Sequence, residues 1–192
     1  MSKYRRLIEI VALAVCLVMS CVLLHHSYRK YLRTCYPNPF EELVLSCAEE
    51  YRFDPSLLMA LIYTESHFEA EAQSSVGAKG LMQLMDSTFE WAQIRLETPE
   101  DARLDPVQLY DPAVNIRYGS YVLYLLREEF TTEDTVLAAY NAGIGTVREW
   151  LQDTAYSDDG KSLRKIPYPE TNDYVKRVRA AQDMYRRLYA YS

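Results

Sequence analysis

The chain has 192 residues with 49% hydrophobic and 25% charged side chains, a balance typical of one globular domain plus a short additional segment. The same composition excludes a disordered tail, because such segments hold too few apolar residues to form a core. With 6 glycines, and neither G-x-G-x-x-G nor G-x-x-x-x-G-K-S/T, the sequence lacks the signals of dinucleotide and P-loop nucleotide sites.

Charge is distributed unevenly along the chain. Residues 1–35 carry six basic side chains against the single acid Glu9, whereas residues 36–192 carry 15 basic and 26 acidic side chains, a net charge of −11. A surface this acidic repels the phosphate backbone of DNA and RNA. The sequence therefore predicts no nucleic-acid partner.

An apolar run of 18 residues extends from Leu7 to Leu24 and is interrupted by only two polar residues. As a helix it would be about 27 Å long, close to the roughly 30 Å thickness of a hydrocarbon core. We expect an uncleaved, single-pass membrane anchor within a basic segment of residues 1–35. A cleaved signal peptide, or a lipoprotein with its lipid at Cys21, is the alternative. Three basic residues lie on each side of the run, so the distribution of charge does not fix its orientation.

The cysteines and histidines predict no metal site. The chain has 4 cysteines, 3 histidines and no C-x-x-C pair, which is too few and too scattered for tetrahedral zinc, so we expect neither a metal nor another cofactor. Cys47 shares a helical stripe with Leu43, Val44 and Tyr51, which predicts a small buried apolar side chain. A disulfide between Cys35 and Cys47 is the alternative in an oxidising compartment.

Helical spacing of apolar residues dominates the chain after Pro37 and Pro39. Asp54-Pro55 and Asp111-Pro112 each combine an N-cap residue with proline at the first helical position. The predicted helices cover residues 40–51, 55–66, 86–95, 113–130, 132–141, 145–151 and 171–189, and the longest loops cover 69–80, 97–110 and 153–170. No segment shows a convincing period-2 strand pattern, so residues 36–192 are expected to form one mainly α domain.

The helix predicted at residues 55–66 places an acidic residue among apolar ones. Glu65 recurs at helical spacing with Leu58, Leu61, Ile62 and Phe68, which puts it on the core-facing stripe. Removing a carboxyl group from water raises its pKa toward the range of a general acid that works near neutrality. The alternative is a helix-end glutamate that turns to solvent.

Two glycine-containing segments follow this helix. In residues 74–85, Gly77 and Gly80 lie beside hydroxyl and amide side chains, a composition that lets the backbone approach a ligand closely. Further along, a second glycine pair follows Tyr140 and Asn141 at a predicted helix end. For this second segment taken alone, an ordinary helix C-cap with a core tyrosine is the simpler interpretation.

Taken together, these segments resemble the soluble lytic murein transglycosylase family, whose domain has a goose-type lysozyme-like helical fold with a substrate cleft. Four blocks, found in the family's order over roughly residues 41–189, carry the resemblance: Glu65-Ser66 with Gly77-Ala78-x-Gly80-Leu81-Met82-Gln83-Leu84-Met85; Asn115-Ile116-x-x-Gly119; Ala138-Ala139-Tyr140-Asn141-Ala142-Gly143; and Ile166-Pro167-x-Pro169-Glu170-Thr171. The chain departs from the usual pattern at Glu69-Ala70, Asp86 and Phe89, so we expect the saccharide subsites to differ in detail.

The resemblance implies roles for seven residues. Glu65 corresponds to the catalytic acid and base, and Ser74 to a hydroxyl that contacts the N-acetyl group beside the scissile bond. The other five line the saccharide groove or face the catalytic carboxylate: Gln83, Met85, Tyr140, Asn141 and Glu170.

The same resemblance implies a reaction. Glycosidases usually need two carboxylates at a fixed separation, whereas this pattern supplies one, Glu65, without a matched second. The substrate itself then substitutes: the acetamido oxygen of N-acetylmuramic acid stabilises the developing cation, and its C6 hydroxyl attacks. The expected activity is therefore that of a peptidoglycan lytic transglycosylase, which leaves a 1,6-anhydro end. Its partners would be glycan strands and, through the apolar run, the membrane, with the domain on the outer side.

Two other functions remain open at this point. One is a hydrolytic muramidase that uses water with the same Glu65, and in which Glu69, Glu71, Asp86 or Glu170 would act as the base. The other is a non-catalytic wall-binding module that has kept the fold.

Overall fold

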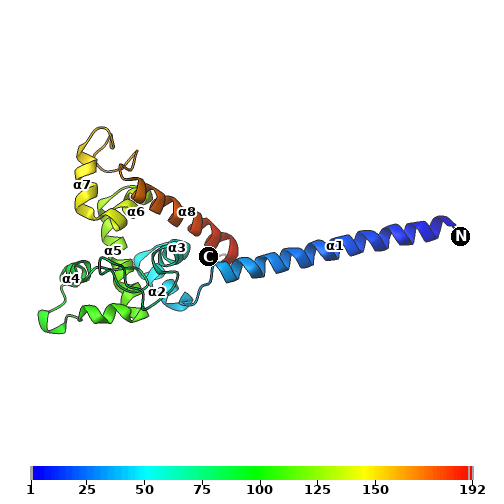
Figure 1. The fold of residues 1–192 in the computed structure, drawn as a ribbon, viewed down its shortest axis with the longest axis horizontal. Helices are drawn as coiled ribbons and strands as arrows, with labels where there is room; N and C mark the ends of the chain where they lie inside the picture. Colours follow the sequence, from blue (N-terminus) through cyan, green and yellow to red (C-terminus); the bar gives the residue numbers. More distant parts are fainter. Residues whose placement is uncertain (1, 190, 192) are drawn as a thin grey trace. The chain divides into compact units, whose positions relative to one another are not determined.

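The computed structural model describes residues 2–189 and 191 and divides the chain into two compact units, Met1–Pro37 and Asn38–Ser192 (Figure 1). The first unit contains a single helix, α1 (Ser2–Cys35). Its segment Tyr4–Cys35 is long and apolar enough to cross a membrane, and the apolar side chains of the predicted run are exposed along it. The helix thus continues for three more turns past that run.

The second unit is helical, and the part of it that the structure describes contains two isolated β-bridges but no strand. Helices α2 and α8 both pack on α3, whereas α5 contacts α2, α4 and α6 (Figure 1). In chain order the elements are α2 (Glu41–Tyr51), α3 (Pro55–Ser66), α4 (Asp86–Arg95), the 3-10 helices η1 (Glu100–Ala102) and η2 (Pro106–Tyr110), α5 (Pro112–Glu129), α6 (Glu133–Ala142), α7 (Ile144–Gln152) and α8 (Pro169–Tyr189).

Helix α3 forms the centre of this unit. It begins at an aspartate–proline pair: the Asp54 carboxylate accepts a hydrogen bond from the Ser56 amide at 2.9 Å, and Pro55 occupies the first helical position. Every residue from Ser56 to Ile62 is buried. The predicted core-facing residues Leu58, Leu61 and Ile62 are buried, but burial is not confined to one stripe: because α2 and α8 both pack against α3, this part of the helix is buried on all sides.

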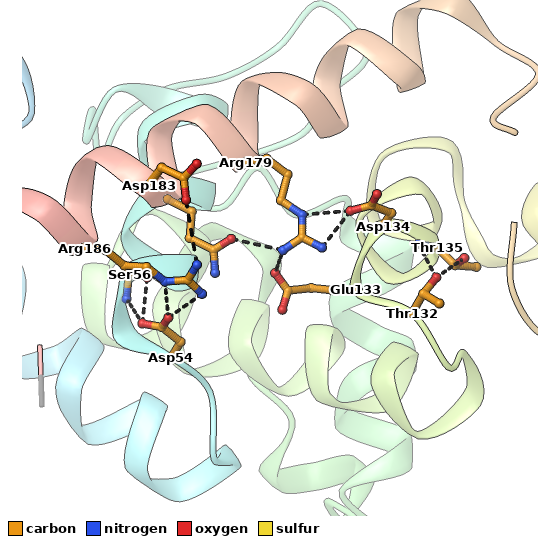
Figure 2. A network of polar contacts seen from close by, with 10 residues as sticks. Asp54, Ser56, Thr132, Glu133, Asp134, Thr135, Arg179, Asp183 and Arg186 are labelled. Carbon is orange, nitrogen blue, oxygen red and sulfur yellow. Dashed lines mark hydrogen bonds and ion pairs between the residues drawn. The ribbon is translucent and has the colours of Figure 1, made fainter. Parts of the chain in front are cut away.

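Helix α8 is amphipathic and covers α3 and α6. On its polar side, Arg186 forms an ion pair with Asp54 at 2.7 Å, and Arg179 forms ion pairs with Glu133 and Asp134 in the first turn of α6 (Figure 2). Such partly exposed pairs contribute little to stability one by one, but together they attach α8 to the N-terminal ends of α3 and α6. The buried face of α8 carries Thr171, Tyr174, Val175, Val178, Ala181, Gln182, Tyr185 and Leu188.

The helices predicted after Pro39 are all present, and their ends lie within two residues of the expected positions. The prediction of a plain loop at residues 97–110 was wrong, because this segment holds η1 and η2. Helix η2 begins at Asp105-Pro106, the same capping signal that starts α3. Cys47 is buried in α2 as expected, and the four cysteines are free.

The N-cap of α3 generates a first prediction. Asp54→Ala removes the hydrogen-bond acceptor of the cap and the partner of Arg186 together. We expect the free energy of unfolding at pH 7 to fall by about 1 kcal/mol from the lost cap alone. Urea denaturation followed by circular dichroism measures the change, and an unaltered midpoint would contradict the role given to the cap.

Asp54→Asn is the matched control, because asparagine keeps the capping acceptor but loses the charge. Burial raises the pKa of the Asp54 carboxyl group, but hydrogen bonds from Ser56 and Arg186 outweigh it and hold the pKa below its usual value. The charge therefore contributes stability above about pH 4 that is lost as the pH falls through the folded pKa. We expect Asp54→Asn to be less stable than wild type at pH 7 and to approach it in acid.

Candidate active site

The acid predicted from the sequence lies in the last turn of α3. The partly buried Glu65 carboxylate accepts a hydrogen bond from the Tyr174 hydroxyl of α8 at 2.6 Å. Burial raises the pKa of Glu65 to about 7, and the Tyr174 hydrogen bond and the positive charge of Arg177 oppose this rise without overcoming it. At neutral pH such a group occurs in both protonation states, which suits a residue that first gives a proton and then takes one.

Two tyrosines surround this carboxyl group. Burial and the charge of Glu65 raise the pKa of both Tyr140 and Tyr174 well above its usual range, so both phenols keep their protons and act as donors. The Tyr140 hydroxyl donates to the Met82 carbonyl oxygen at 2.8 Å. This bond ties α6 to the loop between α3 and α4, so the acid and the loop share one neighbouring side chain.

A buried side chain from α5 holds the same loop. The amide oxygen of Asn115 accepts a hydrogen bond from the Met82 N–H at 2.7 Å, and its amide nitrogen donates to the carbonyls of Lys79 at 3.0 Å and Leu109 at 2.7 Å. All three partners are backbone groups, so Asn115 fixes the path of the loop whatever side chains the loop carries. The resemblance included Asn115 without a role, and the structure gives it this one.

Two glycines let the loop approach α5 closely. A Cβ atom on Gly80, which has a φ of +72°, would lie 2.1 Å from the Leu109 carbonyl oxygen and 2.2 Å from Nδ2 of Asn115. A Cβ atom on Gly119 of α5 would lie 2.4 Å from the sulfur atom of Met82. Any side chain at either position would push the loop away from the helix, so these glycines set the distance between them.

Ser74 and Gln83 use part of their hydrogen-bonding capacity inside the loop. The Ser74 hydroxyl oxygen accepts a bond from the Ala78 N–H at 3.0 Å. Gln83 has a left-handed φ of 48°, and its amide nitrogen donates to the carbonyls of Gly80 at 2.9 Å and Ala72 at 3.2 Å. The hydroxyl proton of Ser74 and the amide oxygen of Gln83 are the groups with which these residues can bind a sugar.

A groove with a volume of about 260 Å³ lies beside the loop. Its polar groups come mainly from the loop and α4, and its apolar surface from α5 and the junction of α6 with α7. Tyr140 belongs both to this groove and to the surroundings of Glu65, so it links the two. The lining residues are Gln83, Leu84, Met85, Ser87, Thr88, Trp91, Val122, Leu126, Ala139, Tyr140, Gly143 and Ile144.

The groove accordingly contains three of the predicted site residues: Gln83, Met85 and Tyr140. Asn141 is exposed in the last turn of α6, and Glu170 is exposed in the first turn of α8, one turn before Tyr174. The lining includes neither Glu65 nor Ser74, Asn141 and Glu170, and the contacts of these four residues with a substrate stay predictions. The part of the chain that the structure describes contains no group of three or more histidine, cysteine or acidic side chains able to hold a metal ion.

Tyr174 is a site residue that the sequence analysis missed. It lies on the buried face of α8, where helical periodicity indicates an ordinary core residue. Its partner Glu65 is 109 positions away in the chain, and no local pattern reveals such a contact. In the sequence, Tyr174 is set apart from other core residues of this helix only by its position close behind the block that ends in Glu170-Thr171.

The raised pKa of Glu65 predicts a stability that decreases with pH. The folded pKa of about 7 lies above the value of about 4.3 expected in the unfolded chain, so the contribution of this group is fully present below about pH 4 and is lost as the pH rises through 7. Glu65→Gln cannot ionise. At pH 8 it should be more stable than wild type by on the order of 3 kcal/mol, as measured by urea denaturation.

At pH 4 the two proteins should have similar stability, because Glu65 is then mostly protonated in both the folded and the unfolded chain. Glu149→Gln, at an exposed position of α7, serves as the control and should change little at either pH. A gain that is equal at pH 4 and pH 8 would show better packing of the amide and not the loss of a titrating group.

Comparison with known proteins confirms the resemblance. Residues 42–163 match the family model described as the transglycosylase SLT domain. The curated relatives include the soluble lytic murein transglycosylase of Escherichia coli K12, 34% identical over 158 residues, and the membrane-bound lytic murein transglycosylase C of Actinobacillus pleuropneumoniae serotype 5b, 28% identical over 163 residues. The alignments cover 81% and 74% of this chain but 24% and 44% of those relatives, so the chain spans only part of their length.

Solved structures agree with these relatives. The lytic transglycosylase Slt from Pseudomonas aeruginosa, solved as an inactive mutant, has a TM-score of 0.71 and 32% identity over 84% of this chain and 26% of its own. The 70 kDa soluble lytic transglycosylase from Escherichia coli has a TM-score of 0.70 and 32% identity over 81% and 25%. At this similarity the expected mainly α, lysozyme-like fold is confirmed. The chain therefore belongs to the transglycosylase SLT family.

Proposed function

We propose that the chain acts as a peptidoglycan lytic transglycosylase that cleaves the β-1,4 bond between N-acetylmuramic acid and N-acetylglucosamine. The observation that carries the proposal is the Glu65 carboxyl group, which has a pKa of about 7, is hydrogen-bonded to Tyr174 and lies close to a groove that shares Tyr140 with it. The names of the relatives, which are lytic murein transglycosylases, support this activity.

In the first step of the proposed reaction, protonated Glu65 gives its proton to the glycosidic oxygen as the bond from that oxygen to C1 of the muramic residue breaks. The Tyr174 hydrogen bond holds the carboxyl group in place during this transfer. The substrate's acetamido oxygen stabilises the positive charge that develops at C1. No second protein carboxylate is needed for this step.

In the second step, ionised Glu65 takes the proton of the C6 hydroxyl while O6 forms a bond to C1. This bond displaces the acetamido oxygen and closes the 1,6-anhydro ring. Glu65 ends the cycle protonated, as it began, and no water is consumed. A pKa near 7 serves both steps, because neither protonation state of the group is strongly favoured at neutral pH.

The proposed substrate contacts follow the same geometry. Gln83, Met85 and Tyr140 would bind the saccharide within the groove that they line. Ser74 would donate its hydroxyl proton to the N-acetyl group, as the resemblance implies. Asn141 and Glu170 would border the cleft at the ends of α6 and α8 that carry Tyr140 and Tyr174.

We also propose that α1 anchors the chain in a membrane with residues 1–6 inside and the catalytic domain outside. Its length and apolar character, and the membrane-bound relative from Actinobacillus pleuropneumoniae, support an anchor. The side is set by the proposed substrate, which lies outside the cytoplasmic membrane. On this view the structure consists of an anchor, residues 1–35, and a catalytic domain, residues 36–192.

Replacing the acid tests the activity. Glu65→Gln keeps the side-chain shape but can neither give nor take the proton, so release of anhydromuropeptides from sacculi should fall by roughly 10²- to 10⁴-fold. The variant should still fold and bind glycan strands. Mass spectrometry of the soluble products measures the release, and near-normal turnover would remove Glu65 from the mechanism.

The origin of the oxygen at C1 tests the reaction type. When wild-type protein acts in ¹⁸O-water, the muramic product should be lighter than a hydrolysis product by the mass of one labelled water and should carry no label, because O6 is the nucleophile. Label at C1 would indicate a muramidase that uses water. Absence of any soluble product, with glycan strands still bound, would indicate a wall-binding module.

A reporter fused after Ser192 tests the topology. Alkaline phosphatase, which requires an oxidising compartment, should be active there, whereas a cytoplasmic reporter such as β-galactosidase should be inactive. The reverse pattern would place the domain inside and would exclude peptidoglycan as its substrate. Mass spectrometry of the mature N-terminus distinguishes an intact α1 from cleavage before a lipidated Cys21.

A further inference from the structure

A largely buried lysine lies beside the groove, and the mechanism proposed above does not use it. Only 16% of the Lys79 side chain is exposed, and its ammonium group contacts both carboxylate oxygens of Asp86, at 2.7 and 2.9 Å. Asp86 is the first residue of α4, and its side chain is 53% exposed. Because an ammonium group shielded from water is costly without a partner, we regard this pair as a fixed contact.

The backbone of Lys79 is also the centre of the loop. Its N–H donates to the Leu84 carbonyl at 2.9 Å, and the Leu84 N–H donates back at 3.1 Å. The Lys79 carbonyl accepts the bond from Asn115, and a β-bridge joins Lys79 to Gln73. The backbone of Lys79 is therefore bonded to the loop residue Leu84 and to Asn115 of α5, and its side chain contacts α4.

The two residues flank the wall of the groove. Gln83 and Met85 line the groove and lie between Lys79 and Asp86 in the chain. Met85 is the N-cap residue of α4 but makes no side-chain capping bond. The ion pair is a polar side-chain contact that joins the first turn of α4 to the loop. The same wall continues along α4 with Ser87, Thr88 and Trp91.

We propose that Lys79 and Asp86 are positioning residues for saccharide binding: their ion pair keeps the loop part and the α4 part of one groove wall in register. The inference rests on the proposed function, because it takes the groove to be the glycan site. It predicts a larger effect on binding than on the chemical step, since Glu65 and its tyrosine neighbours belong to α3, α6 and α8, outside this wall.

The test is a double-mutant cycle in the full chain, with Glu65→Gln as the inactive parent for binding. Isothermal titration calorimetry with chitohexaose gives the Kd; this probe is uncharged, so a change of charge at residue 79 or 86 does not by itself alter its attraction. Lys79→Met and Asp86→Asn should each raise Kd roughly three- to tenfold, because the wall loses preorganisation. The double variant should be no worse than the weaker-binding single variant, since the two residues act through one contact.

Arg148→Met is the matched control. It breaks an ion pair with Glu129 of similar geometry, at 2.6 and 2.7 Å, between α7 and α5. Its Kd should stay within about twofold of the parent. In the active background, KM for sacculi should rise in the Lys79 and Asp86 variants while kcat changes little, and melting curves establish that each protein is folded.

Asp86→Asn changes an exposed helix-start residue and keeps the test valid if Lys79→Met fails to fold. An unchanged Kd in folded Asp86→Asn would overturn the inference and assign the pair to stability alone. Additive effects of the two substitutions would overturn it as well. If the parent does not bind chitohexaose and the wild type releases no anhydromuropeptides, the proposed function itself is contradicted. If binding and release are both observed, but the variants of Lys79 and Asp86 have the same Kd and KM as their parents, only this inference is contradicted.

Discussion

The desolvation of one carboxyl group is the constraint on which the rest of this structure depends. Burial at the end of α3 raises the pKa of Glu65 to about 7, so its ionised form is disfavoured in the folded protein. Keeping the group there requires a core that surrounds α3, and that core comes from α2 and α8. The carboxylate accepts its hydrogen bond from Tyr174 of α8, and the ion pairs of Arg179 and Arg186 fix that helix at the ends of α3 and α6.

The groove and the acid are built from different parts of the chain, and a few polar contacts relate them. Asn115 binds backbone groups on both sides of the loop, and Tyr140 binds the Met82 carbonyl while it faces Glu65. At Gly80 and Gly119 the loop and α5 lie too close for a side chain, so these glycines permit the contact. The partners in the loop are backbone atoms, so these particular contacts do not depend on the side chains that the loop carries.

Residues assigned to the substrate also build the loop that presents them. The amide nitrogen of Gln83 donates to two loop carbonyls, and the backbone of Gln83 has a left-handed conformation. The Ser74 hydroxyl accepts a hydrogen bond from the Ala78 N–H. A non-glycine residue in that region is costly unless its surroundings enforce it. The shape of the wall and its chemistry are therefore linked, and a substitution at Gln83 acts on both. Lys79 and Asp86 differ in this respect, because their contact shapes the wall without facing the sugar in our proposal.

Local sequence determined the α-helices after Pro39 and their ends, and it predicted which residue is the acid. Capping pairs such as Asp54-Pro55 satisfy the first amides of a helix within three residues, and the apolar spacing of α8 marks its buried face, so both can be recognised without a fold. The order of four short motifs identified the family and predicted Glu65 as its acid. What only the tertiary structure decided are contacts between distant residues: the burial of α3 on all sides, the Tyr174 bond to Glu65, the role of Asn115 and the pairing of Lys79 with Asp86. The physical reason is that a pKa depends on everything packed around a group, whereas a helix cap depends on its neighbours in the chain.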